Sequence, residues 1–173
     1  MKLALLSSIV LFLYPFASFA QNPHREQLVT QAKAIAKATA KKDYAYLANS
    51  SYPKILEQKG GTEKMISELK EKTKQLSKMG IDFIDMKIGE PDPLFKAGSE
   101  LHCLVPETLR FQTPAGELKQ NSWLLAISNN EGLTWYFIDV SLLNEKRVKE
   151  LFPDFNPLLK IPVAKQPELS PVD

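Results

Sequence analysis

Three ionisable side chains on predicted strands could together transfer a proton: Asp85, His102 and Asp139. A carboxylate that faces an apolar pocket has its pKa raised towards the range of a general base, and a neighbouring histidine can share its proton. We therefore treat these three as the candidate catalytic residues. The alternative is a structural role for each, with Asp85 in solvent, Asp139 ending a strand or capping a helix, and His102 satisfied or exposed.

Aromatic side chains form a second candidate set, for binding rather than catalysis. We expect Tyr46, Trp123, Trp135 and Tyr136 to line the mouth of a pocket or an exposed sheet face, where an apolar ligand or a partner could dock. The alternative is that they belong to the hydrophobic core. Both faces of the strand holding Trp135 and Tyr136 are aromatic. If helices cover only one face, the other could form a homodimer.

Several kinds of site are not expected from the composition. Lys+Arg 22 against Asp+Glu 20 leaves no strongly basic domain for nucleic acid. His24 and His102 lie far apart with no His/Cys cluster, so neither a metal nor another cofactor is predicted. The single cysteine, Cys103, cannot form an internal disulfide. It is either a buried core thiol or, if exposed as a thiolate, a nucleophile or an intermolecular disulfide partner.

The first 20 residues resemble an export signal rather than part of the fold. Lys2 precedes a mostly apolar run from residue 3 to 16, and Ala17-Ser18-Phe19-Ala20 provides small residues at a cleavage site. This pattern predicts a signal peptide (1–20), cleaved after Ala20, and a periplasmic or secreted protein that no longer contacts the membrane. The alternative is an uncleaved anchor, but Pro15 interrupts the apolar run, which is also short for a membrane span.

Helical periodicity dominates the chain up to Gly80. The spacing predicts a first helix from Pro23 to the lysines at 41–42, a short helix capped by Asp43, and one or two turns from Pro53. A longer helix follows from Thr62 to Gly80.

From residue 81 the apolar period becomes two, which indicates strands at 81–88, 101–112, 123–127 and 134–140. In the first, Asp82, Ile84, Met86 and Ile88 are expected to share one face. Short turns between strands make the sheet antiparallel, and helices that precede it define an α+β fold. We predict N-terminal helices on one face of a curved sheet of about four strands, then a short C-terminal helix. The domain covers 21–156, and 157–173 is a Pro-rich, extended tail.

The order of these elements carries a resemblance. Lys42-Asp43-Tyr44-Ala45-Tyr46-Leu47 after an Ala-rich helix, and the hairpin 123–139 with its Asn-Asn-Glu-Gly turn, resemble the nuclear-transport-factor-2-like superfamily, the cystatin-like α+β cone. The resemblance implies a cavity between helices and sheet, and frequent dimers through the open sheet face. Its members include isomerase- and dehydratase-like enzymes and many non-catalytic binding modules.

Three functions follow as hypotheses. The first is an exported, non-catalytic domain that binds a small apolar ligand or a protein partner. The second is an isomerase- or dehydratase-like enzyme with an Asp/His proton shuttle in the pocket. The third is a structural assembly module that acts through the open sheet face. The absence of a catalytic motif favours the first.

Overall fold

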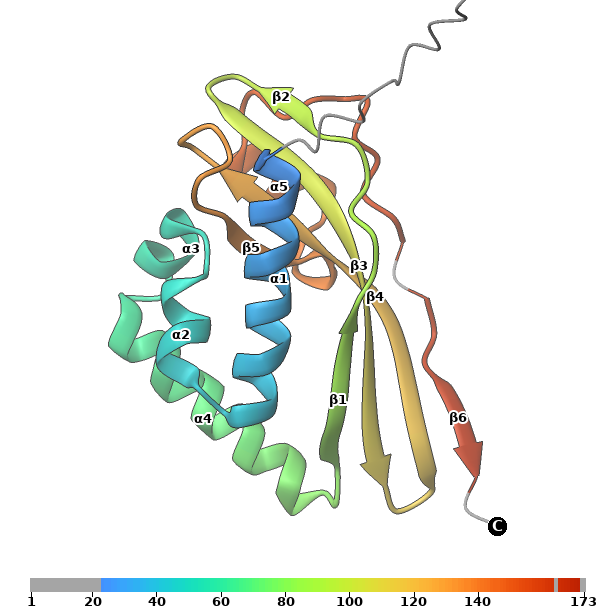
Figure 1. Cartoon of the computed structure of the whole chain (residues 1–173). Helices are drawn as coiled ribbons and strands as arrows, with labels where there is room; N and C mark the ends of the chain where they lie inside the picture. The colour runs from blue at the N-terminus through green and yellow to red at the C-terminus, as the bar shows by residue number, and fades with distance from the viewer. Residues whose placement is uncertain (1–22, 164, 172–173) are drawn as a thin grey trace, which may run out of the picture.

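The chain folds as a layer of helices against an open antiparallel sheet (Figure 1). The structure is a computed structural model that describes residues 23–163 and 165–171. The predicted α+β class is confirmed, but the sheet has six strands where about four were expected. The predicted signal peptide lies outside the described residues. Within the described part of the chain, no helix combines the length and the apolar character that crossing a bilayer requires.

Four helices form the first layer: α1 (Pro23–Lys41), α2 (Tyr44–Asn49), α3 (Pro53–Gln58) and α4 (Thr62–Lys78). α1 buries Leu28, Ala32, Ile35 and Ala38 against the sheet. The two alanines on this face let the helix backbone approach the strands closely. The Asp43 side chain caps α2 by accepting a hydrogen bond from the backbone N–H of Tyr46 at 3.0 Å.

Two long strands form the centre of the sheet, β3 (Glu100–Thr113) and β4 (Gly116–Ser128), joined by a tight turn. Each has two short neighbours on its outer side. β1 (Asp82–Ile88) and β2 (Phe95–Ala97) pair with β3, whereas β5 (Tyr136–Asp139) and β6 (Glu168–Pro171) pair with β4. β2 and β6 are the two strands that the sequence patterns did not predict, because each is only three or four residues long.

A β-bulge in β1 changes which residues face the helices. The register shifts between Phe83 and Asp85, so that Phe83 pairs with Phe111 and Asp85 with Arg110. Met86 and Ile88 share the inner face as expected, but the bulge separates them from Asp82 and Ile84, so the expected face of four residues is wrong for those two. One extra residue in a strand shifts the alternation of all residues beyond it by one. Phe83 and Met86 therefore share a face although they are three residues apart.

The two faces of the sheet pack against different parts of the chain. The inner face contacts α1 and holds Cys103, Val105, Leu124, Ala126, Trp135 and Phe137. The outer face was expected to be open. Its half away from the β3–β4 turn is instead covered by α5 (Glu145–Leu151) and the residues after it, which bury Leu151, Phe152 and Leu159 against Leu104, Leu125 and Ile127. Residues 157–161, predicted as tail, thus contribute to the core.

Candidate ligand pocket on the inner face of the sheet

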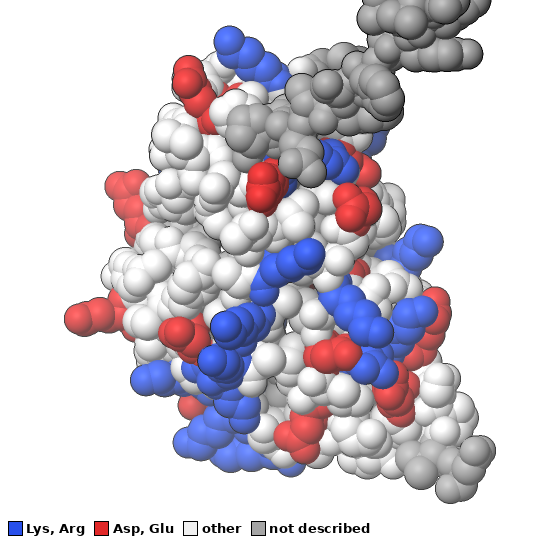
Figure 2. Space-filling view, viewed as in Figure 1, with Lys and Arg blue, Asp and Glu red and all other residues white. Residues whose placement is uncertain are grey.

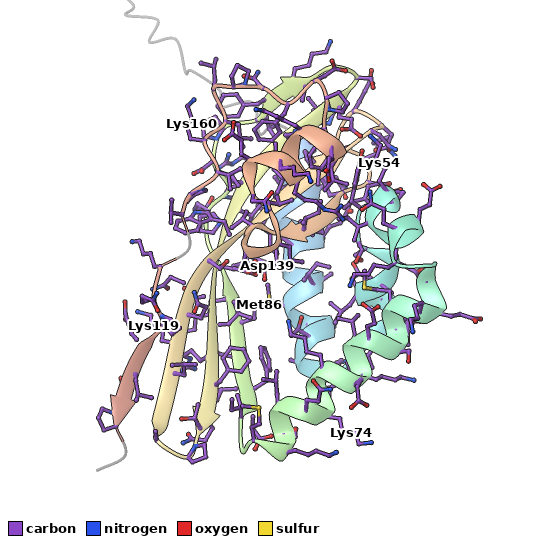
Figure 3. The ribbon with its side chains drawn as sticks, turned by 180° about the vertical axis from the view of Figure 1, so that it is seen from behind. Lys54, Lys74, Met86, Lys119, Asp139 and Lys160 are labelled. Atoms are coloured by element: carbon purple, nitrogen blue, oxygen red, sulfur yellow. The ribbon has the colours of Figure 1, made fainter. Side chains whose placement is uncertain are left out.

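A cavity of about 390 Å³ lies between the helical layer and the inner face of the sheet. Residues from α1, α2, α4 and strands β1, β3, β4 and β5 line it. Figure 3 shows Met86 and Asp139 on the side of the sheet that faces the helices. The volume falls at the small end of the range for pockets that bind small molecules, which is about 300–1,000 Å³.

Three polar side chains form a row across the strands on the inner face of the sheet, and two of them, Glu107 and Asp139, line this cavity. Glu107 on β3 pairs with Ser122 on β4, and Leu124, two residues further along β4, pairs with Asp139 on β5. Alternation along the strands therefore places all three on the inner face. The Ser122 Oγ lies 3.5 Å from Oδ1 of Asp139.

Glu107 is the most unusual of these residues. Its side chain is buried, with only 4% of the residue exposed, and it borders the cavity without a hydrogen bond or ion pair to any described residue. Burial raises the pKa of Glu107 from its ordinary value to about 8, and the negative charge of nearby Asp139 raises it further in the same direction. At neutral pH, Glu107 is therefore mainly a neutral acid that can donate a hydrogen bond into the pocket.

Asp139 is held in place by the backbone that follows it. Its Oδ1 accepts a hydrogen bond from the backbone N–H of Ser141 at 2.8 Å, which caps the short 3₁₀ helix η1 (Val140–Leu142). This is the capping role considered from sequence, but the same side chain also lines the pocket. Glu107 and Asp139 thus form a pair of carboxyl groups with different surroundings, one unpartnered and one anchored.

Apolar side chains form most of the remaining wall. Phe83 and Phe111 contact each other edge to face with ring centroids 5.8 Å apart, and Met86 and Leu109 pair across β1 and β3. Lys42 and Lys72 lie at the outer rim of the cavity, and both are exposed.

The structure does not bring the three candidate catalytic residues together. Asp85 lies on the outer face, where its Oδ1 accepts a hydrogen bond from Nε of Arg110 at 2.8 Å, and this contact lowers the pKa of Asp85. His102 also lies on the outer face, fully buried, with Nε2 3.1 Å from Oε2 of Glu100. Burial lowers the pKa of His102, so its ring is neutral at neutral pH. Only Asp139 borders the pocket.

The aromatic candidates are likewise dispersed. Trp135 is buried beneath α1, and its Nε1 donates a hydrogen bond to the carbonyl oxygen of Gly132 at 2.9 Å. Trp123 and Tyr136 pack against the outer hydrophobic cluster, whereas Tyr46 on α2 is partly exposed. None of the four lines the inner pocket. Cys103 is buried, as the simpler of its two interpretations predicts.

Sequence reasoning missed Glu107, although a signal was present. Val105, Glu107, Leu109 and Phe111 alternate along β3, so a carboxylate occupies a position where the pattern calls for an apolar residue. Because Pro106 precedes it, the strand was expected to be interrupted there, and the residue was not assigned to a face.

Comparisons with family models, curated proteins and solved structures give no significant match. Among residues 23–163 and 165–171, no group of three or more His, Cys, Asp or Glu side chains could hold a metal ion. The function must therefore be argued from the pocket and its residues.

Proposed function

We propose that this protein binds a small, largely apolar molecule in the inner pocket, with Glu107 as its polar anchor. The observation that carries the proposal is a buried carboxyl group without a partner at the wall of an apolar cavity. A ligand that forms a hydrogen bond with Glu107 would give this carboxyl group a partner that no described residue supplies.

The carboxyl groups of Glu107 and Asp139 determine which hydrogen-bonding groups the inner end of the ligand should carry. Protonated Glu107 can donate a hydrogen bond to a carbonyl or hydroxyl oxygen, and Asp139, fixed by the Ser141 N–H, can accept one from a hydroxyl group. The apolar walls formed by Phe83, Met86 and Phe111 suit a hydrocarbon body. The ligand class is thus an apolar molecule with an oxygen function at one end.

Two expectations from sequence are compatible with this function. The resemblance to the nuclear-transport-factor-2-like superfamily implies a cavity between helices and a curved antiparallel sheet, and we retain that membership as a proposal. The predicted signal peptide (1–20) would place binding in the periplasm or outside the cell. A homodimer through the sheet would have to use the half of the outer face next to the β3–β4 turn. That half is polar, with Asp85, Arg110 and Glu117 joined by ion pairs, so we assign the function to the pocket.

The experiment fills the pocket and measures binding of a neutral apolar dye, N-phenylnaphthylamine, by fluorescence. Leu109→Trp replaces a pocket-lining leucine with a bulkier indole ring on the inner face. The matched control, Gln112→Trp, places the same indole ring on the exposed outer face of the same strand. We expect the wild type and Gln112→Trp to bind the dye with equal affinity, and Leu109→Trp to bind at least about tenfold more weakly. Circular dichroism checks that both variants fold. Equal binding by folded Leu109→Trp, or no dye binding by the wild type, would refute the proposal.

A second candidate function, proton transfer on the bound molecule, is favoured by one observation. Glu107 and Asp139 are neighbouring carboxyl groups in different surroundings, one without a hydrogen-bonding partner among the described residues and one anchored by the Ser141 N–H, as in enzymes that use one group as acid and the other as base. Glu107→Gln distinguishes the two functions, because an amide still donates a hydrogen bond but cannot give up a proton. Binding alone would survive this substitution. Solvent deuterium incorporation into a bound ketone, followed by NMR, would stop if Glu107 is the acid.

A further inference from the structure

The rim of the pocket carries lysine side chains, whereas its inner wall carries the carboxyl groups of Glu107 and Asp139. Lys42, directly after α1, and Lys72, on α4, both line the opening, and neither forms an ion pair with any described residue. Figure 2 shows Lys and Arg side chains gathered over α1 and the adjoining part of α4. Exposed lysines occur at 33, 37 and 41 on α1, spaced by one turn, and at 74 and 78 on α4. The approach to the pocket is therefore positively charged.

The pocket thus changes in character from its rim to its inner wall. Unpaired lysines stand at the opening, Met86, Leu109 and Phe111 form an apolar middle, and Glu107 and Asp139 border the inner wall. A cationic ligand would have to pass the lysines before reaching the carboxyl groups, which lowers its rate of entry and its affinity. An anionic group at the side of the opening formed by Lys42 and Lys72 meets complementary charge, whereas the exposed Asp82 lies at the β1 side of the pocket.

We propose that the ligand is an amphipathic anion, whose carboxylate binds at Lys42 and Lys72 while its apolar body fills the pocket and carries, at its inner end, the oxygen function that reaches Glu107. This inference rests on the proposed function and names the ligand class for the same site. Its length must match the cavity of about 390 Å³, so a medium-length alkyl chain or a small ring system fits better than a long lipid.

The backbone conformation of Lys42 allows the effect of its charge on binding to be separated from an effect on folding stability. Its φ of 56° lies in the left-handed region, where a side chain is disfavoured by roughly 1–2 kcal/mol and glycine is not. Lys42 directly follows the C-terminal end of α1, a position that glycine commonly occupies. Lys42→Gly should therefore remove the charge without loss of folding stability, and any loss of binding can be assigned to the lysine side chain.

The experiment compares three probes with the same chain: decanoate, decanol and decylamine, each titrated into the protein by isothermal calorimetry. We expect decanoate to bind about three- to tenfold more tightly than decanol, and decylamine more weakly than either. Added sodium chloride at about 0.5 M should reduce the advantage of decanoate over decanol, because rim charges are exposed to solvent.

Two double variants test which lysines cause the preference for decanoate over decanol. Lys42→Gly with Lys72→Ala should remove the preference for decanoate and leave decanol binding unchanged. The matched control, Lys41→Ala with Lys70→Ala, removes two exposed lysines from the same helical layer that do not line the pocket, and should retain most of the preference.

The outcomes separate this inference from the proposed function. If decanol binds as tightly as decanoate, or if the control pair loses the preference as completely as the rim pair, the ligand class is wrong and the pocket function stands. If none of the three probes binds and N-phenylnaphthylamine also fails, the proposed function itself is refuted. Retention of decanoate preference by the rim pair would equally overturn the role of Lys42 and Lys72.

Discussion

Strand β3 buries a histidine, His102, on the outer face of the sheet and a glutamate, Glu107, on the inner face, and the surroundings of these two side chains differ. His102 on the outer face is enclosed by the rings of Phe152 and Phe155, with Nε2 paired to Glu100. Its Nδ1 is buried without a hydrogen-bond partner among the described residues, yet the packed rings leave no room for a ligand beside it. Glu107 on the inner face borders the cavity. We therefore select the candidate group by the adjoining cavity rather than by burial alone.

The reason for this difference lies in what each face packs against. The outer face is covered by a segment rich in large side chains, Leu151, Phe152 and Leu159, which fill the space above the strands. The face of α1 that packs on the inner face has two alanines, Ala32 and Ala38, beside Leu28 and Ile35, and α4 has no buried residue at all. Because α4 stands away from the sheet, a cavity remains between them.

The largest effect that would test this comparison is the loss of packing on the outer face. Phe152→Ala should lower the free energy of unfolding by about 3–5 kcal/mol, because the ring is buried and contacts His102 and Tyr52. The matched substitution on the inner face, Phe111→Ala, should cost no more than about 2 kcal/mol, because part of that ring already borders the cavity. Urea denaturation measures both. Equal losses would mean that the inner face is packed as densely as the outer face.

The next effect concerns the pH dependence of stability that Glu107 imposes. Its pKa is about 8 in the folded protein against an ordinary value of 4.5, so the unfolded chain loses this proton first as pH rises. Stability linked to Glu107 is fully present below about pH 4.5. It falls by up to about 1.4 kcal/mol per pH unit until the pH reaches about 8.

Glu107→Gln should remove this fall, which thermal unfolding at several pH values would show. Glu117→Gln, which changes a partly exposed carboxylate on the outer face, serves as the control. A wild-type stability that does not change between about pH 5 and 8 relative to Glu107→Gln would contradict the buried, neutral state of this acid.

The smallest expected effect is the opposite slope from His102. Burial lowers the pKa of His102 below its ordinary value of 6.5, so acidification protonates the unfolded chain before the folded protein. Stability linked to His102 is therefore present above about pH 6.5 and is lost as the pH falls towards the folded pKa. His102→Leu should reduce this acid destabilisation. Midpoints of thermal unfolding at about pH 5 and 7.5 give the comparison. An unchanged acid response in His102→Leu would show that other groups cause it.

Local patterns in the sequence were sufficient for the elements and for the class of fold. Helical spacing before Gly80 and alternation after it gave the helices and the four longer strands, because these patterns depend on neighbours in the chain. The bulge at Ile84, by contrast, inverted one strand, and the short strands β2 and β6 carry too few residues for a pattern to be recognised. The register of Asp85 with Arg110 followed from that bulge and could not be derived from alternation.

The sequence by itself thus determined which segments form helices and strands, and that the strands run antiparallel, since hydrophobic period and turn residues are local properties. Only the tertiary structure decided which ionisable groups meet. Asp139 and Glu107 approach each other across three strands, whereas His102 is turned to the other face and covered by a segment fifty residues further along the chain. Such proximity depends on strand register and on which segment covers which face, and neither is encoded in any short stretch of sequence.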